Sequence, residues 1–88
     1  MIEREAMIVN QEGLHARPAA RIVRLASSFN SEIEICKDGV GVNGKSIMGV
    51  MMLAAECGSS ITIRADGPDA EQAAAALAAL VASGFGEQ

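Results

Sequence analysis

The only histidine of the chain, His15, lies two residues before Arg17 in the segment GLHARPAA (residues 13–20). A neutral imidazole can attack phosphorus as a nucleophile, and a guanidinium can hold phosphate oxygens through two parallel hydrogen bonds. Pro18 suits the first turn of a helix, where its missing N–H is not needed. We therefore expect His15 at or just before a helix N-terminus, where unpaired N–H groups and the helix dipole favour an anion. This order of residues predicts a histidine that becomes phosphorylated, with Arg17 beside the phosphate.

The setting of His15 also bears on the charge of its ring. A positive helix end and a nearby guanidinium disfavour a protonated ring, so we expect a neutral, nucleophilic imidazole near neutral pH. The alternative is that His15 only caps the helix and faces water. The surrounding octapeptide favours the nucleophile.

A second segment that could handle phosphate is GVGVNGKS (residues 39–46), which has the spacing of a P-loop. Three features argue against that interpretation. Asp38-Gly39 followed by alternating residues indicates a β-hairpin. The chain has room for too few β-α-β units, each of which takes about 30 residues. The best candidate for a magnesium-binding aspartate, Asp66, comes two residues after an arginine and directly before a turn. We favour the hairpin and keep a nucleotide-binding P-loop as an alternative.

Length and composition limit the classes of protein that remain. The 88 residues predict one domain, residues 1–88, with a single core. A net charge of -4 and the absence of Trp and Tyr argue against a nucleic-acid-binding surface. The N-terminal residues lack the apolar run of a signal peptide, and no stretch reaches the length of a membrane span. We therefore expect a soluble cytoplasmic protein without direct membrane insertion.

The two cysteines, Cys36 and Cys57, are far apart in the sequence and form no CxxC motif. With a single histidine in the chain, we expect neither a metal site nor a bound cofactor. Two reduced thiols that pack as small core hydrophobes are the favoured interpretation. A disulfide between them remains the alternative.

Hydrophobic periodicity indicates the elements that must position these residues. Alternation predicts strands over residues 4–10, 32–37, 40–42 and 60–66, and a period near 3.6 predicts helices over residues 16–28, 47–56 and from about 68 to 83. Each strand has one apolar face, which suits an α+β fold with helices on one side of an antiparallel sheet. Along the first helix Arg17, Arg21 and Arg24 lie opposite the apolar stripe.

The helix predicted after Ser46 is apolar all round, and a small two-layer domain cannot bury every side of it. Its surplus apolar surface, rich in methionine, is typical of a docking patch that fits several partners. The alternative is that the methionines only fill gaps in the core. Ser46 itself is expected to cap this helix.

The segments GLHARPAA and NGKSIMGVMML together resemble HPr, the histidine-containing phosphocarrier family of the bacterial phosphotransferase system, and the likeness covers essentially the whole chain. The resemblance implies an HPr-like open-faced β-sandwich, in the order β-α-β-β-α-β-α, with a four-stranded antiparallel sheet and three helices on one face. It implies that His15 accepts phosphate on Nδ1 from phosphorylated enzyme I and donates it to IIA proteins or domains in sugar uptake. By the same resemblance, Arg17 stabilises the phosphate.

The resemblance also implies where partners bind. The predicted contacts are Leu14, Ala20, Ile47, Met48 and Met51. The exposed arginines, Arg21 and Arg24, should add positive charge that attracts acidic partners.

Ser46 has a second role by resemblance. In a subset of the family the matching serine is phosphorylated by an ATP-dependent HPr kinase/phosphorylase, and the context GKSIMGVM resembles that subset. A phosphate there would place negative charge in the docking patch.

We expect a monomer that acts as a stoichiometric carrier rather than as an enzyme with turnover of its own. Two alternative functions remain compatible with the sequence. The chain could serve a nitrogen-related regulatory branch, which the short tail SGFGEQ suggests. It could also be a regulatory binding module that acts through the phosphoserine state of Ser46.

Overall fold

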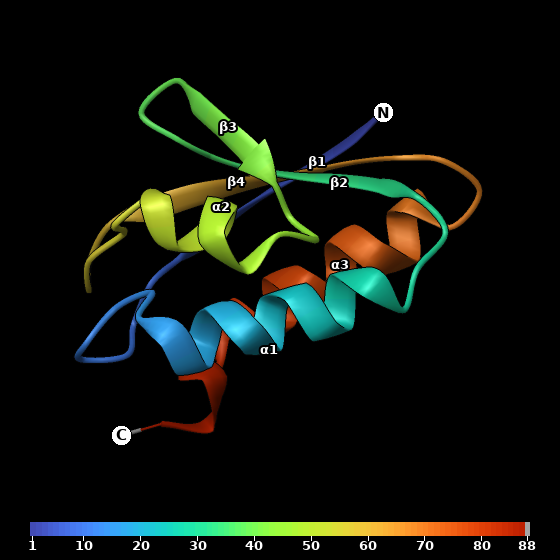
Figure 1. Ribbon diagram of the computed structural model, residues 1–88. Coiled ribbons are helices and arrows are strands. Elements are labelled where there is room, and N and C mark those ends of the chain that lie inside the picture. The colour runs from blue at the N-terminus through green and yellow to red at the C-terminus, as the bar shows by residue number, and fades with distance from the viewer. Residues whose placement is uncertain (88) are drawn as a thin grey trace.

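Four strands form one antiparallel sheet in the computed structural model, which describes residues 1–87 (Figure 1). They are β1 (Ile2–Met7), β2 (Glu32–Lys37), β3 (Val40–Asn43) and β4 (Ser60–Asp66), and their order across the sheet is β1-β4-β2-β3. Every neighbouring pair is antiparallel. Successive side chains of a strand point to opposite faces, so alternation buries Ile33 and Ile35 on one face and leaves Glu32 and Glu34 on the other.

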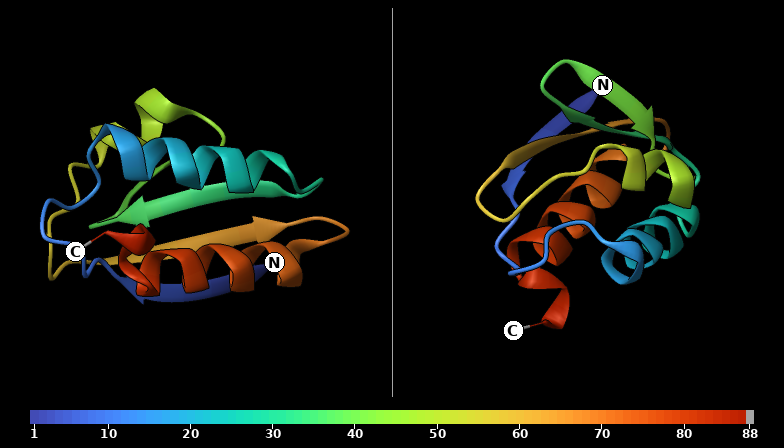
Figure 2. Two further views of the ribbon diagram at one scale, coloured as in Figure 1. Left: turned by 90° about the horizontal axis from the view of Figure 1, so that it is seen from below. Right: turned by 60° about the vertical axis from the view of Figure 1, so that its left-hand side comes forward.

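Three helices cover one face of this sheet, and the other face is open (Figures 1 and 2). They are α1 (Ala16–Ser27), α2 (Ile47–Met52) and α3 (Ala70–Ala82), followed by a 3-10 turn, η1 (Gly84–Gly86). The predicted fold class, an open-faced sandwich in the order β-α-β-β-α-β-α, is confirmed. None of the helices formed by residues 1–87 has both the length and the hydropathy to cross a membrane.

The core lies between the helices and the covered face of the sheet. Ile22 of α1 and Leu77 of α3 are fully buried, and they belong to one cluster with Ile61 and Ile63 of β4. Phe85 of η1 also belongs to this cluster and is 2% exposed. Its burial ties the C-terminal turn to the rest of the fold, because a buried aromatic side chain contributes a large apolar area.

The hairpin predicted at Asp38-Gly39 is confirmed. Both residues have positive φ angles, 51° and 82°, as a two-residue type I′ turn requires. The turn joins β2 to β3 in antiparallel register, with Lys37 opposite Val40.

The first strand and the second helix differ most from the sequence-based expectation. The first strand covers Ile2–Met7 rather than residues 4–10, although Ile8 still donates its N–H to the carbonyl of Ser59 over 2.8 Å. The second helix ends at Met52 rather than at residue 56. The reason is Ala54, whose φ of 50° lies in the left-handed region and stops the helix.

The expectation that both cysteines pack in the core is wrong. Cys57 is exposed, and Cys36 lies half-buried on the same side of β2 as Glu34, which is the open face. Both thiols are free. Burial raises the pKa of the Cys36 thiol, and the neighbouring Glu34 carboxylate raises it further.

Asp69 joins the start of α3 to the loop that precedes β2. Its carboxylate accepts hydrogen bonds from the Ser31 hydroxyl over 2.5 Å and from the N–H groups of Ser31 and Asn30, each over 2.9 Å. The Ser31 hydroxyl in turn accepts a hydrogen bond from the Asp69 N–H. These hydrogen bonds, first that of Ser31 and then that of Asn30, lower the pKa of Asp69 below its ordinary value.

We expect this carboxylate to make stability depend on pH at the acidic end. Because the folded-state pKa is depressed, the contribution of Asp69 is fully present above the ordinary aspartate value and is lost as the pH falls through the folded-state pKa. Asp69→Asn should therefore unfold at lower urea concentration than the wild type at neutral pH, and the difference should shrink toward acidic pH. Urea titrations across the acidic range measure both effects, with Asp66→Asn, at an exposed carboxylate of β4, as the control. An undiminished gap at low pH would contradict the expectation.

Candidate functional site

His15 is the N-cap residue of α1. Its backbone is extended, with φ -83° and ψ -171°, and its carbonyl accepts the N–H of Ala19 over 3.0 Å. The side chain makes no capping hydrogen bond, and it is 37% exposed. The side-chain capping bond of the alternative is therefore absent, and the imidazole lies half-exposed at the positive helix end.

The loop before α1 holds the ring at the surface. Leu14 is 5% exposed and belongs to the core, while its N–H donates to the carbonyl of Ala55 over 2.9 Å. The N–H of His15 donates to the carbonyl of Gly13 over 3.0 Å. Leu14 thus anchors the loop, and its burial leaves little of its own surface for the partner contact predicted from the sequence.

Arg17 is exposed in the first turn of α1, two residues after His15. That turn contains no acidic residue. The first N–H groups of a helix have no intrahelical acceptor, so they and the Arg17 guanidinium can both donate to an anion near the ring. This arrangement can bind phosphate without a metal ion or a deep cavity.

Two carboxylates also stand beside the ring, and they were missed from the sequence. The Oε2 atom of Glu87 lies 3.2 Å from Nε2 of His15, and Oε1 of Glu12 lies 3.9 Å from it. A carboxylate favours the charged form of an imidazole, whereas a helix N-terminus disfavours it. The positive setting predicted for His15 from the helix end and Arg17 therefore also includes two carboxylates. The contact of Glu12 with the ring could have been suspected, because Glu12 lies in the turn just before His15. The one sequence signal for the contact of Glu87 was Phe85, an aromatic residue that could anchor an otherwise small and polar tail.

The three arginines of α1 are all exposed, as predicted. Arg21, however, donates through its guanidinium to the carbonyl of Phe85, so it binds the C-terminal turn of its own chain. Arg24 lies in the last turn of the helix, where a cation complements the helix dipole. Of these three arginines, Arg17 lies closest to His15 in the sequence.

Exposed apolar side chains gather on α2, which we call the α2 patch. Its members Ile47, Met48 and Met51 are 45%, 73% and 39% exposed. Met52, absent from the predicted contacts, is 78% exposed. Val50 alone among the helix residues is fully buried. The alternative that these methionines only fill core gaps is therefore wrong for Met48 and Met52; docking at the patch and at the half-buried Ala20 remains a prediction.

Ser46 is the N-cap of α2, as predicted. Its hydroxyl oxygen accepts the N–H of Gly49 over 3.1 Å, and its carbonyl accepts the N–H of Val50 over 3.0 Å. The side chain is half-buried at the edge of the α2 patch. A charge on this hydroxyl would therefore lie next to the exposed methionines.

Residues 39–46 do not form a P-loop. They include the turn residue Gly39 and the second strand of an antiparallel hairpin, and the donors that would surround a phosphate are already bonded. The Gly44 N–H donates to the carbonyl of Ile33 over 2.8 Å, the Lys45 N–H donates to Oδ1 of Asn43 over 2.9 Å, and Nζ of Lys45 donates to the carbonyl of Phe29 over 2.9 Å.

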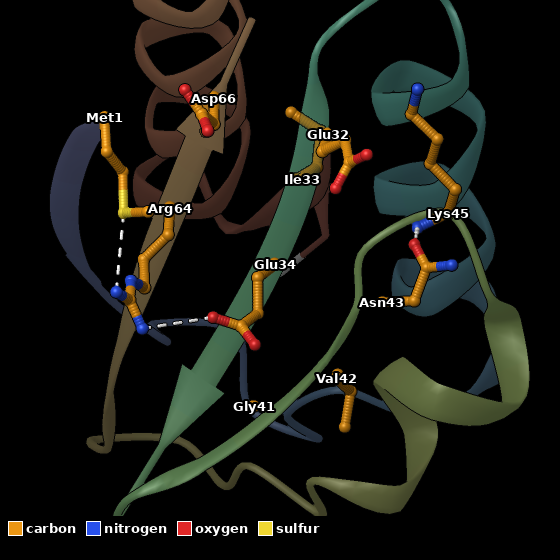
Figure 3. Close-up of a pocket in the computed structure, with 11 residues that line it drawn as sticks. Met1, Glu32, Ile33, Glu34, Gly41, Val42, Asn43, Lys45, Arg64 and Asp66 are labelled. Carbon is orange, nitrogen blue, oxygen red and sulfur yellow. Dashed lines mark hydrogen bonds and ion pairs between the residues drawn. The ribbon is translucent and has the colours of Figure 1, made fainter.

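A hollow of about 650 Å³ lies along β2, β3 and β4, and Glu34 and Arg64 are among the residues that line it (Figure 3). Figure 3 shows the Arg64 guanidinium reaching across to Glu34, with Nη1 and Oε1 3.2 Å apart. The lining residues include neither His15 nor Arg17. Residues 1–87 hold no group of three His, Cys, Asp or Glu side chains suited to a metal ion. The candidate phosphate site is therefore the exposed end of α1 and not this hollow.

Comparisons with known proteins found relatives that share the sequence and the fold of this chain. A family model described as "PTS HPr component phosphorylation site" matches residues 2–83. The phosphocarrier protein HPr of Cupriavidus necator is 49% identical over 87 residues, which are 99% of this chain and 98% of that protein. The crystal structure of HPr-C-His from Thermoanaerobacter tengcongensis superposes with a TM-score of 0.95 at 48% identity, covering 100% of this chain and 99% of that one. Crh, a catabolite-repression protein of Bacillus subtilis whose crystal structure is an intertwined, domain-swapped dimer, superposes with a TM-score of 0.77 at 42% identity, covering 96% and 97%.

Proposed function

The chain belongs to the HPr family of phosphocarrier proteins of the phosphotransferase system, and we propose on that basis that His15 is the residue that takes up and surrenders the phosphoryl group. The observation that carries the proposal is the half-exposed imidazole at the N-terminus of α1, free of any capping bond. An exposed ring can be reached by a donor protein and then by an acceptor protein, which is what a carrier needs.

In the proposed cycle phosphorylated enzyme I donates to Nδ1 of His15, and a IIA protein or domain in sugar uptake then receives the group. The phosphate would lie against the first-turn N–H groups of α1, with the Arg17 guanidinium binding its oxygens. No cofactor takes part in this scheme. The chain is reloaded in each cycle rather than converting a small substrate by itself.

The α2 patch is the proposed docking surface for both partners. The loop of His15 is bonded to the segment that follows α2 through the Leu14 N–H and the carbonyl of Ala55, which supports a docking surface that includes both the patch and the ring. Exposed Met48 and Met52 can adapt to different partners, and the positive charge of Arg17 and Arg24 attracts acidic ones. We propose a monomer that works in the cytoplasm through small, short-lived interfaces, because tight binding would stall the relay.

Incubation with enzyme I and labelled phosphoenolpyruvate tests this function. The wild-type chain should become labelled, and the label should be labile in acid and stable in base, as expected of a phosphorus–nitrogen bond. A chain that stays unlabelled, or a label stable in acid, would contradict the proposal.

We propose in addition that Ser46 is a regulatory site for an HPr kinase/phosphorylase. Its half-buried hydroxyl at the N-terminus of α2 adjoins the proposed docking surface. A phosphate there would add about two negative charges to a surface that must attract acidic partners.

Ser46→Asp should mimic that state and lower kcat/KM for phosphate transfer from enzyme I by about tenfold. Aspartate caps helices as well as serine does, so the fold of α2 should persist. Ser46→Asn, a neutral cap of similar size, is the matched control and should transfer at nearly the wild-type rate. Uptake by the aspartate variant at the unmodified rate would show that charge at this residue does not control docking.

The likeness to Crh, a catabolite-repression protein, supports a second candidate, a regulatory binding module. In this chain such a module would act through the phosphoserine state proposed above for Ser46. The presence of His15 argues against this as the sole role.

A separate question is whether the phosphate serves sugar uptake or a nitrogen-related branch. Identifying the IIA protein that accepts the label from this chain separates those two branches.

A further inference from the structure

The side chain of Glu87 contacts the ring of His15, although 72 residues separate them in the sequence. Its Oε2 and Oε1 atoms lie 3.2 and 3.3 Å from Nε2. The Glu87 side chain is 21% exposed and that of His15 is 37% exposed, so the contact is partly shielded from water. Any role of Glu87 in phosphate transfer rests on the proposed function of His15.

Three contacts bring the tail to the ring, and Figures 1 and 2 show the C-terminal turn beside the loop that precedes α1. Phe85 is buried in the core and fixes the turn. The Arg21 guanidinium donates to the carbonyl of Phe85, and the N–H of Glu87 donates to the carbonyl of Gly84 over 2.9 Å. The carboxylate is thus placed by an anchored turn and not by a free end.

Asn10 aims the carboxylate at the ring. It is 3% exposed, and its Nδ2 donates both to the carbonyl of Gly13 over 2.8 Å and to Oε1 of Glu87 over 3.1 Å. Both partners are acceptors, so the amide can lie only with its nitrogen toward them. Its Oδ1 has no hydrogen-bond partner among residues 1–87.

We propose that Glu87 is a positioning residue that selects Nδ1 of His15 as the atom that receives phosphorus. In a neutral imidazole one ring nitrogen carries the hydrogen and the other carries the lone pair. An ionised carboxylate can only accept a hydrogen bond, so Glu87 requires the hydrogen on Nε2 and leaves the lone pair on Nδ1.

The same contact stabilises the product of transfer. The Nδ1 lone pair forms the bond to phosphorus while the bond between phosphorus and the donor atom breaks, and that electron pair stays on the donor. The hydrogen remains on Nε2, and the ring becomes positively charged. The Glu87 carboxylate then faces a cation, and such charge-assisted hydrogen bonds are stronger than neutral ones.

The tautomer of the unphosphorylated ring gives a test that needs no phosphate. Ring 15N shifts of His15, recorded at a pH at which the ring is neutral, should show almost only the Nε2–H form in the wild type. Glu87→Ala should move both shifts toward those of an unconstrained imidazole. Glu87→Gln offers an N–H donor as well as an oxygen acceptor, so it should hold the Nε2–H form less strictly than Glu87 does. Glu12→Gln is the comparison and should change the shifts less than Glu87→Ala, because Glu12 is 77% exposed and lies 3.9 Å away.

Initial rates of label uptake from enzyme I complete the test. Glu87→Ala should be slower than the wild type by about fivefold, and Glu87→Gln and Glu12→Gln should each be slowed by less. A Glu87→Ala protein with the wild-type tautomer, or with an altered tautomer and the wild-type rate, would overturn the role of Glu87. A wild-type chain that takes up no label would instead overturn the function of His15 itself.

Discussion

His15→Ala is expected to take up no label from phosphoenolpyruvate and enzyme I, while the wild-type chain becomes labelled to near stoichiometry. The substitution removes the one imidazole of the chain, and neither the Arg17 guanidinium nor a backbone N–H can act as a nucleophile toward phosphorus. The loss should therefore be complete rather than partial. Scintillation counting of the acid-labile fraction measures it.

Two controls separate lost chemistry from lost structure. The ring makes no capping hydrogen bond and is 37% exposed, so its removal should leave the helical circular dichroism and the urea midpoint close to wild type. His15→Asn supplies a side chain that caps helices well and has no nucleophilic ring nitrogen, so it should fold and also fail to take up phosphate. Acid-labile label on either variant would mean that another residue is the carrier.

The parts of the fold that could be predicted are those set by local sequence. The Asp38-Gly39 pair specifies a two-residue turn, and alternation in residues 32–37 and 60–66 follows from burial of one face of each strand. The end of α2 could not be predicted in the same way. It depends on Ala54, a residue without a preference for the left-handed conformation that it adopts.

The candidate site also has one part that local sequence predicts and one part that it does not. His15 and Arg17 are neighbours in the sequence, and Pro18 marks the start of their helix, so their relation could be inferred from three residues. Glu87 reaches the ring because Phe85 is buried and Arg21 binds the carbonyl of Phe85. Those contacts depend on the packing of α3 against the sheet, which no pattern near His15 reveals. Long-range contacts of this kind are the part of a site that a single sequence conceals.

Gly13→Ala should lower the free energy of unfolding by roughly 2–4 kcal/mol. Gly13 has a φ of 71°, a conformation that costs any residue with a Cβ atom about 1–2 kcal/mol. A Cβ there would also overlap the carbonyl oxygen of Ala55 and lie 3.1 Å from Cα of Glu56. Because these are backbone atoms, the loop itself must move. Urea denaturation should show a lower midpoint with an unchanged m-value.

Gly39→Ala is the matched control, since Gly39 has a φ of 82° but a Cβ at that residue would meet no atom within 4 Å. It should lose only about 1 kcal/mol. The two variants should also differ in function, because the carbonyl of Gly13 accepts the N–H of His15 and a shifted loop displaces the ring from the end of α1. Gly13→Ala should thus take up label more slowly even where it is fully folded, whereas Gly39→Ala should match the wild type. Equal losses of stability in both variants would mean that the loop before α1 accommodates the added methyl group without strain. The position of His15 would then not depend on the packing of Gly13 against Ala55.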